Sequence, residues 1–401
     1  MKILFLTIAR LESVSERGIY TDLMREFRNN HHDIYIACPS ERKYRKKTSR
    51  NSIDGVTILN IWTLNFQKTN IIEKGFCTLM IDSQFKKAIK KYYNEIRFDL
   101  VLYTTPPITL TNTIKYIKNK CNAVSYLLLK DIFPQNAVDM EMISKNGLIY
   151  SYFRKKEQLL YSISDYIGCL SPANVNFLLK HNPKINSKVV EVNPNSIKPL
   201  KEKKLKHHKI NIRNKYNIPT DAIVFIYGGN LGKPQGIDFL AKVLLSNVNK
   251  DKVFIVIVGS GTEFNRLLNL NKHLSPKNIK VIKSLPKNDY DELLRCCDIG
   301  LIFLDNRFTI PNIPSRLLPY LENKLPVLAA TDLSTDIGKI IIDNKFGFWV
   351  KSGDLNEYNK KIQYFVKNFN KIDKMGKNGF DFLINNYTVD ISYRKIIEKI
   401  Q

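Results

Sequence analysis

The sequence lacks the patterns that would mark a membrane-spanning, disulfide-rich or zinc-binding protein. No run of about 18 apolar residues occurs, and the apolar stretch 1–9 is followed by Arg10 without a signal-peptide cleavage site. The six cysteines form no C-x-x-C pair, and the six histidines form no H-E-x-x-H motif. We therefore expect reduced core cysteines, no metal cofactor and a cytosolic protein.

Acidic residues are also scarce, with 37 Asp and Glu against 63 Lys and Arg, which leaves a net charge of +26. Such a charge is typical of proteins that bind nucleic acid, an anionic lipid surface or a polyanionic small substrate, although a general bias toward lysine accounts for part of it. Basic residues are dense at 42–50 and 201–215, and at 85–97 they alternate with aromatic residues. Charge alone leaves these three classes of partner open.

Short apolar runs alternate with helical patterns along the whole chain, and a basic stretch at 197–215 interrupts them. A chain of 401 residues is long enough for two domains. Alternating strands and helices predict parallel sheets covered on both faces, with ligands beyond the carboxyl ends of the strands. We expect an α/β protein with two Rossmann-like domains that face each other across a cleft. The expected ranges are 1–196 for the first domain, 197–380 for the second, and 381–401 for a C-terminal helix that returns to the first.

Three predicted strands of the second domain end in residues suited to hold an anion. These ends are Gly228-Gly229-Asn230 after strand 222–228, Gly259-Ser260-Gly261 after strand 252–258, and Asn312-Ile313-Pro314-Ser315-Arg316 after strand 298–304. Glycines allow close approach of the backbone to a ligand, and helix N-termini and cations attract phosphate. No Walker A loop and no G-x-G-x-x-G fingerprint is present. Ordinary tight turns would also account for the glycines.

The order and spacing of these motifs resemble those of GT-B-fold glycosyltransferases of family 4. That family typically has G-R-x-x-x-x-K-G after a strand, then V-G-x-G, then an E-x-x-x-x-x-x-x-E stretch that ends in G-x-P-V. The matching segments here are 229–236, 258–261 and 311–327. In the first half, Thr104-Thr105-Pro106-Pro107 and Asp131-Ile132-Phe133-Pro134-Gln135 resemble the subgroup that adds amino sugars, notably N-acetylfucosamine, in capsule and O-antigen synthesis.

The chain departs from the family pattern at residues that usually contact the donor. Asn230 and Gln235 replace the loop Arg and Lys, so Lys233 is the cation that remains in that loop. Pro311 and Pro319 replace the two glutamates, of which the second usually holds the donor ribose. Glu322, nearly one turn further along, is a candidate replacement for that contact.

The resemblance implies roles for thirteen residues. Donor contacts are expected from Arg17, Gly18, Gly228, Gly229, Asn230, Gly259, Gly261, Asn312, Ser315 and Glu322. Lys233 and Arg316 are expected to neutralise the diphosphate, with Ser315 as the N-cap of the helix that follows, although Arg316 could instead be a solvated arginine at a helix start. Asp131 is expected to orient the acceptor hydroxyl, and its alternative is a turn aspartate. Arg17 and Gly18 would alternatively be a plain helix start.

Two further motifs have simpler explanations. Asp289-Tyr290-Asp291 resembles the D-x-D metal motif of other transferases, but it begins a predicted helix, where acidic residues favour the positive end of the dipole. Cys296-Cys297 lies at the end of that helix, beside a strand, and we expect both side chains to pack in the core.

The segment 76–98 mixes aromatic and basic residues. Its aromatic residues include Phe85, Tyr92, Tyr93 and Phe98, and its basic residues are Lys86, Lys87, Lys90, Lys91 and Arg97. Such a helix could rest on an anionic membrane, with the aromatic side chains as anchors and the lysines on the headgroups. The alternative is a helix that faces the core and has a solvated basic side.

Together these observations predict a glycosyltransferase. It would move an N-acetylated (deoxy)hexosamine, such as N-acetyl-L-fucosamine, from a UDP-sugar to a polyprenyl-diphosphate-linked saccharide in capsular or O-antigen synthesis, with retained configuration. The alternatives are a UDP-sugar 2-epimerase of the same fold and a non-catalytic nucleic-acid-binding protein. Histidines are missing at the strand ends, and no nucleic-acid-binding module is recognisable. We therefore expect no nucleic-acid partner, and a cytoplasmic enzyme peripherally associated with the inner face of the membrane.

Overall fold

The computed structural model describes residues 1–66, 69, 71–200 and 206–400. They form two compact units: unit 1 is Met1–Lys198 with Tyr387–Gln401, and unit 2 is Pro199–Asn386. These boundaries lie close to the positions 196 and 380 expected from the sequence. Among the described residues, no helix combines the length and the apolar character needed to cross a bilayer.

Unit 1 is built on an eight-stranded sheet with the order β3-β4-β2-β1-β5-β6-β7-β8. The strands are β1 (Lys2–Leu6), β2 (Asp33–Glu41), β3 (Ser49–Ile53), β4 (Val56–Thr63), β5 (Leu100–Thr104), β6 (Val124–Leu129), β7 (Tyr166–Cys169) and β8 (Val190–Val192). The helices are α1 (Ile19–Asn29), α2 (Ile71–Tyr92), α3 (Thr111–Cys121), α4 (Gln135–Asp139), α5 (Leu148–Ile163), α6 (Pro172–His181) and α15 (Val389–Ile397). All strand pairs are parallel except β3 with β4.

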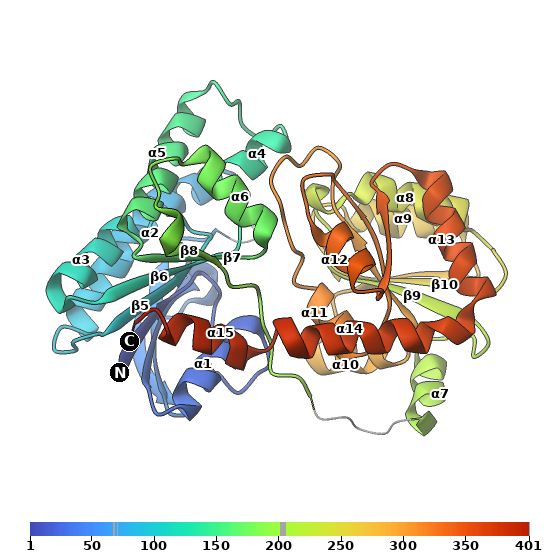
Figure 1. The fold of residues 1–401 in the computed structure, drawn as a ribbon, viewed down its shortest axis with the longest axis horizontal. Coiled ribbons are helices and arrows are strands. Elements are labelled where there is room, and N and C mark those ends of the chain that lie inside the picture. Colours follow the sequence, from blue (N-terminus) through green and yellow to red (C-terminus); the bar gives the residue numbers. More distant parts are fainter. Residues whose placement is uncertain (67–68, 70, 201–205, 401) are drawn as a thin grey trace. The chain divides into compact units, whose positions relative to one another are not determined.

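Helices cover both faces of this sheet, as expected for parallel strands that are apolar on both sides. On one face α1 and α15 pack together, and Phe27 and Ile396 belong to the same buried cluster as Phe5 (Figure 1). The opposite face is covered by α2, α3 and α5. The last helix therefore packs within unit 1, although more than 180 residues of unit 2 separate it from β8 in the sequence.

Unit 2 is built on a six-stranded parallel sheet with the order β11-β10-β9-β12-β13-β14. The strands are β9 (Ile223–Asn230), β10 (Val253–Ser260), β11 (Ile279–Lys283), β12 (Ile299–Phe303), β13 (Val327–Thr331) and β14 (Gly347–Lys351). The helices are α7 (Lys206–Lys215), α8 (Ile237–Ser246), α9 (Phe264–Leu274), α10 (Lys287–Arg295), α11 (Leu317–Glu322), α12 (Ile337–Asp343), α13 (Leu355–Lys367) and α14 (Ile372–Asn386).

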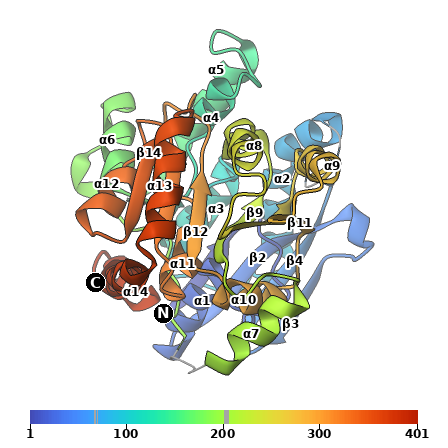
Figure 2. The same ribbon diagram turned by 90° about the vertical axis from the view of Figure 1, so that its right-hand side faces the viewer.

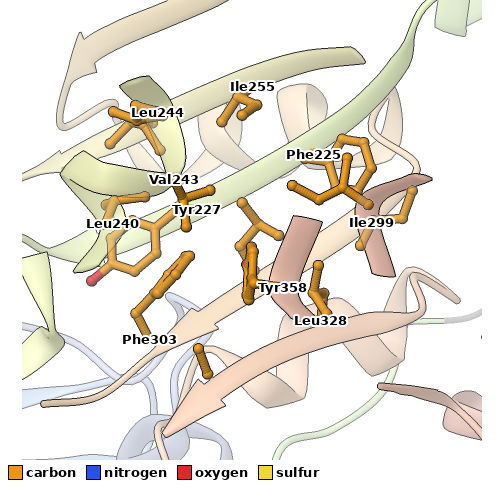
Figure 3. Packing of buried hydrophobic residues seen from close by; sticks show 14 of the residues in the cluster. Phe225, Tyr227, Leu240, Val243, Leu244, Ile255, Ile299, Phe303, Leu328 and Tyr358 are labelled. Atoms are coloured by element: carbon orange, nitrogen blue, oxygen red, sulfur yellow. The ribbon is translucent and has the colours of Figure 1, made fainter. Parts of the chain in front are cut away.

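The core of unit 2 follows from the alternation of side chains along β9. Phe225 and Tyr227 point to the face covered by α8, α9 and α13, where they pack with Phe303 and Tyr358 (Figure 3). The other face carries α10, α11 and α14 (Figure 2). All strand pairs of this sheet are parallel, so the carboxyl ends of its strands lie at the same edge.

Several elements differ from the sequence-based expectation. Strands β3 and β14 and helices α4 and α6 are not among the elements that the sequence predicts. The sequence has a helical pattern over 354–398, and the structure divides this stretch into α13, α14 and α15. The basic stretch 197–215 contains α7, which tertiary contacts hold in place. Arg213 of α7 forms a buried ion pair with Asp298 at 2.8 Å and also donates to the carbonyl of Cys296. This pairing stabilises a helix whose own residues have little apolar character.

Candidate active site

The end of β9 is shaped by the close approach of its backbone to two buried tyrosines. A Cβ atom on Gly228 would collide with the hydroxyl end of Tyr290, so only glycine lets the strand pass there. The amide of Gly228 donates to the Tyr320 hydroxyl at 3.1 Å, and that hydroxyl also lies 3.2 Å from the carbonyl of Ile226. These contacts hold the C-terminal end of β9 against Tyr290 of α10 and Tyr320 of α11.

The second glycine strand end packs directly against the first. A Cβ atom on Gly259 would overlap the carbonyl oxygen of Gly229, and one on Gly261 would lie 2.5 Å from the carbonyl of Leu231. Gly229 itself has φ of +127°, a conformation that favours glycine. Close packing of two loops therefore accounts for these glycines, and it leaves the exposed backbone of Gly229 without a side chain above it.

Arg316 lies beside this bare backbone. Its guanidinium carbon is 4.2 Å from the centre of the Tyr227 ring, and its Nη2 donates to Gln235 Oε1 at 2.5 Å. The same Nη2 is 3.6 Å from the place that a Cβ atom on Gly229 would occupy. Tyr227 and Gln235 therefore hold the guanidinium plane in one orientation at the end of β9.

One nitrogen of Arg316 has no partner within the described part of the chain. Its Nη1 is buried and donates to no hydrogen-bond acceptor among those residues. An unsatisfied buried donor costs about 1–3 kcal/mol, and more when it is charged, so such groups in native proteins call for an explanation. A guanidinium fixed on one side and unpaired on the other is suited to bind an oxyanion.

Lys233, Asn230 and Asn312, which were also expected in this site, lie on the loops around the end of β9 and before α11. Lys233 is exposed at the start of a single 3-10 turn, Lys233–Gln235, and Asn230 is exposed at the end of β9. Asn312 lies on the loop before α11, where its amide donates to the Thr335 hydroxyl at 3.0 Å. Contacts unite the glycines, Gln235 and Arg316, while Lys233 projects from the same loop.

Ser315 does not cap the helix that follows, contrary to the sequence-based expectation. Helix α11 begins at Leu317 with Arg316 in the N-cap position, and no side chain there makes a capping hydrogen bond. Pro314 and Ser315 instead form a turn, in which the amide of Leu318 donates to the carbonyl of Ser315 at 3.2 Å. Pro319 is tolerated because amides of the first helical turn have no partner within the helix.

Glu322 lies at the opposite end of α11 from Arg316. Its Oε1 accepts a hydrogen bond from the amide of Leu200 at 2.8 Å. This contact gives Glu322 a role in holding the segment that leads into unit 2. A ribose contact from Glu322 stays a prediction.

In unit 1, Asp131 follows the carboxyl end of β6. Asn136 Nδ2 donates to both carboxylate oxygens at 2.9 Å, and the backbone of Asp131 is held by Thr105 Oγ1. Burial raises the pKa of Asp131 to about 6, against which the Asn136 hydrogen bonds act. Asn136 Oδ1 is buried and has no hydrogen-bond partner in the described ranges. The pair is thus a held carboxylate that titrates near neutral pH.

The neighbouring Lys130 was not predicted as a site residue. Its Nζ donates to the carbonyl of Asn193 at 3.3 Å, and burial lowers its pKa to about 7. The sequence contains no signal for this, because a lysine after a strand is usually solvated.

Arg17 and Gly18 stand at the start of α1, as expected. Gly18 is the N-cap, and its amide donates to Asp22 Oδ1 at 3.1 Å. Arg17 Nη2 donates to the carbonyl of Lys198 at 3.3 Å, and both residues line a cavity of about 400 Å³. Asp22 therefore already occupies part of the positive end of this helix.

The simpler explanations for the two remaining motifs agree with the contacts. Asp289 lies in the first turn of α10 and pairs with Lys215 at 3.5 Å, and Asp291 pairs with Lys287. Within the described ranges, no three His, Cys, Asp or Glu side chains gather as metal ligands would. Cys296 and Cys297 are buried and their thiols donate to the carbonyl of Leu293.

The aromatic anchors expected on 76–98 are placed otherwise. Phe85, Tyr93 and Phe98 are buried against the sheet, with exposed fractions of 0, 1 and 2 %. The Tyr92 hydroxyl donates to the carbonyl of Thr48 at 3.3 Å. Phe85, Tyr93 and Phe98 are therefore not available as membrane anchors, and the prediction is wrong for these three residues. Tyr92 is partly exposed, and its role as an anchor stays a prediction. Phe76, in contrast, is 58 % exposed.

Comparison with known proteins finds similarity to glycosyltransferases. Residues 208–382 match the family model described as glycosyl transferases group 1. The chain is 22 % identical over 377 residues to an uncharacterized glycosyltransferase of Methanocaldococcus jannaschii, covering 93 % of this chain and 91 % of that protein. It is also 22 % identical over 287 residues to the probable glycosyltransferase WbjE of Pseudomonas aeruginosa, covering 70 % and 69 %. A segment of 68 residues is 35 % identical to the O-antigen biosynthesis glycosyltransferase WclY of Escherichia coli, 17 % and 18 % of the two chains.

Solved structures share the fold across the whole chain. Sucrose-phosphate synthase from Thermosynechococcus elongatus superposes with a TM-score of 0.77 at 14 % identity, covering 99 % of this chain and 98 % of that one. Anabaena HepE in complex with UDP-glucose superposes with a TM-score of 0.71 at 14 % identity, covering 100 % and 99 %. Residues 208–382 therefore match the group 1 glycosyltransferases, the chain has the GT-B fold with two Rossmann-like domains, and the protein is a glycosyltransferase.

Proposed function

We propose that this glycosyltransferase transfers an N-acetylated (deoxy)hexosamine, such as N-acetyl-L-fucosamine, from a UDP-sugar to a polyprenyl-diphosphate-linked saccharide. The product would serve capsular or O-antigen synthesis, and the anomeric configuration would be retained. The observation that carries the proposal is the fixed guanidinium of Arg316, whose buried Nη1 is unpaired among the described residues. The O-antigen relative and the HepE complex with UDP-glucose support the choice of pathway and nucleotide.

The chemical task is to stabilise the departing nucleoside diphosphate. When the bond between the sugar and the β-phosphate breaks, negative charge grows on the phosphate oxygens. Arg316 would donate to one of these oxygens through Nη1, while Tyr227 and Gln235 keep its plane in place. Lys233, exposed on the same loop, would close over the diphosphate from the solvent side. These two cations would supply the charge neutralisation that a metal ion supplies in other transferases.

Asp131 would orient the acceptor hydroxyl. In a retaining transfer the nucleophile approaches from the same face of the sugar from which the leaving group departs. The phosphate oxygens can therefore take up the proton of the acceptor hydroxyl, and a separate strong base is not required. Asn136 would hold the Asp131 carboxylate, whose pKa of about 6 keeps it ionised at neutral pH. The acceptor is lipid-linked in this proposal, so the enzyme would work peripherally at the inner face of the membrane.

The first test is calorimetric titration of the purified protein with UDP, with GDP and ADP as comparators. We expect saturable binding of UDP that is lost or strongly weakened in Arg316→Ala. Transfer from UDP-N-acetyl-hexosamines to a lipid-linked acceptor, followed by mass spectrometry, then identifies the sugar. Absence of UDP binding to the wild-type protein would overturn the proposal.

A further inference from the structure

Large apolar side chains are exposed together in one part of unit 1. Leu148 and Ile149 in the first turn of α5 are 90 % and 59 % exposed, and Phe76 and Leu79 of α2 are 58 % and 57 % exposed. Met80 and Tyr152 on the same helices are also exposed. In unit 2 the exposed large apolar residues, such as Leu333 and Ile342, come from separate segments. Single exposed apolar residues are ordinary, whereas a group of them indicates an interaction surface.

We call the six residues Phe76, Leu79, Met80, Leu148, Ile149 and Tyr152 the apolar face. Helices α2 and α5 cover the same side of the eight-stranded sheet (Figure 1). Leu79 of α2 and Tyr152 of α5 line a common hollow of about 270 Å³. On α2, Leu79 and Met80 lie one helical turn after Phe76. On α5, Tyr152 lies one turn after Leu148 and Ile149. Each helix therefore presents its apolar residues on one side.

Cationic and hydroxyl groups lie within this face. Lys86 and Lys156 line the same hollow, and Lys156 Nζ lies 5.6 Å from the centre of the Tyr152 ring. The hollow also contains Thr109, whose buried hydroxyl has no hydrogen-bond partner within the described part of the chain. Asp82 lines it as well, but its carboxylate accepts hydrogen bonds from the amides of Asn112 and Thr113 and from the Thr113 hydroxyl. The hollow thus contains two lysines, a hydroxyl without a partner in the described residues, and one carboxylate that is already hydrogen-bonded within the protein.

We propose that the apolar face docks the enzyme on an anionic lipid bilayer. The leucine, isoleucine, methionine and aromatic side chains enter the boundary between headgroups and acyl chains, and Lys86 and Lys156 bind lipid phosphates. The choice of a bilayer rests on the combination of exposed aliphatic residues with flanking lysines, which is typical of interfacial segments, and on the net charge of +26. The proposal rests on the proposed function in that a lipid-linked acceptor requires work at such a surface.

The test is co-flotation of the full-length protein with vesicles. One set contains phosphatidylcholine alone, and the other contains equal parts of phosphatidylglycerol and phosphatidylcholine. The wild-type protein should float with the anionic vesicles in a salt-sensitive manner. The double variant Leu148→Ser and Ile149→Ser should bind at least about tenfold more weakly, because affinity scales with the apolar area inserted. The matched control, Leu333→Ser and Ile342→Ser, changes equally exposed residues of unit 2 and should bind as the wild type does.

The charged part is tested separately. Lys86→Gln with Lys156→Gln should weaken binding to anionic vesicles by about tenfold, whereas the exposed pair Lys242→Gln with Lys272→Gln should change it little. Circular dichroism and thermal unfolding confirm that each variant is folded. Wild-type protein that binds neither kind of vesicle, or apolar-face variants that bind as well as their controls, would overturn the proposal.

UDP titration of the same samples separates this inference from the proposed function. The apolar-face variants should bind UDP with wild-type affinity. Protein that binds UDP but no vesicles would retain the enzyme assignment and lose the docking face. Protein that binds anionic vesicles through this face but no UDP would do the reverse.

Discussion

Removing the Arg316 guanidinium should weaken UDP binding more than it weakens the fold. Its Nη1 is a buried, charged donor without a partner in the described ranges, and a hydrogen bond from a charged donor to phosphate contributes about 1.5–3 kcal/mol. Arg316→Ala should therefore raise the dissociation constant for UDP by about 10- to 150-fold. The loss of the contact with the Tyr227 ring should cost a further ~0.5–2 kcal/mol in stability, which thermal unfolding measures separately.

The matched control is Arg266→Ala. Arg266 also lies in unit 2, and it pairs with Asp238 and Glu263 at the surface. Its removal should leave UDP affinity unchanged, because its ion-pair partners Asp238 and Glu263 lie outside the end of β9. If Arg316→Ala bound UDP as tightly as Arg266→Ala, the assignment of the diphosphate site would be wrong.

Gln235 separates a positioning role from a purely structural one. Gln235→Leu removes the acceptor that orients Arg316 Nη2, and we expect UDP binding to weaken by about 2- to 12-fold. Gln235→Glu would form an ion pair with Arg316, so the melting temperature should hold or rise. UDP binding should nevertheless fall further, because the new carboxylate neutralises the guanidinium and repels the diphosphate. Full recovery of UDP affinity in Gln235→Glu would contradict this reasoning.

Three further outcomes are expected. Gly259→Ala should cost about 1–3 kcal/mol of unfolding free energy, because its Cβ would overlap the carbonyl of Gly229 and backbone cannot yield easily; urea unfolding checks this, and an unchanged midpoint would contradict it. Asp131→Asn should lower turnover and remove an ionisation near pH 6 from the pH–rate profile, since wild-type activity should fall as pH drops through that pKa; a profile with the same ionisation in the variant would exclude Asp131 as its source. The pKa of Lys130 is lowered to about 7, so the unfolded chain binds more protons than the folded protein between about pH 7 and 10.5. The unfolding free energy of the wild type relative to that of Lys130→Met should therefore rise with pH across this range. A difference in unfolding free energy that does not change with pH would refute this prediction.

The sequence was sufficient to predict the architecture, since strand and helix periodicities recur regularly through both units. It missed α7 because that helix depends on the Arg213–Asp298 pair, which joins residues far apart in the chain. It missed β3 because the residues Ser49–Ile53 are mostly polar and exposed, and this strand is held by its pairing with β4. Local propensity does not record such long-range contacts.

The candidate site was predicted only in part, for a related reason. The glycines and Arg316 stand out as residue types at strand ends, so spacing revealed them. In the sequence, Gln235 is recognisable only as the residue that replaces the lysine of the family pattern. Its hydrogen bond with Arg316 depends on how the loop and α11 pack together. Tyr227 reads in the sequence as one more apolar strand residue, although its ring supports the guanidinium. Similarly, burial of Phe85 and Tyr93 depends on which side of α2 meets the sheet.

The return of α15 to unit 1 has a consequence for the order in which the protein is made. Ile396 and Ile397 complete a buried cluster with residues of α1 and β1, and Ser392 donates to Asn193 Oδ1 at 2.6 Å. During vectorial synthesis, the first 198 residues emerge from the ribosome long before these partners do. Unit 2 is continuous and can close its core as soon as it emerges, whereas apolar residues of α1 in unit 1 stay uncovered until α15 has been made. Nascent chains stalled before residue 389 should therefore be the forms that engage chaperones most strongly.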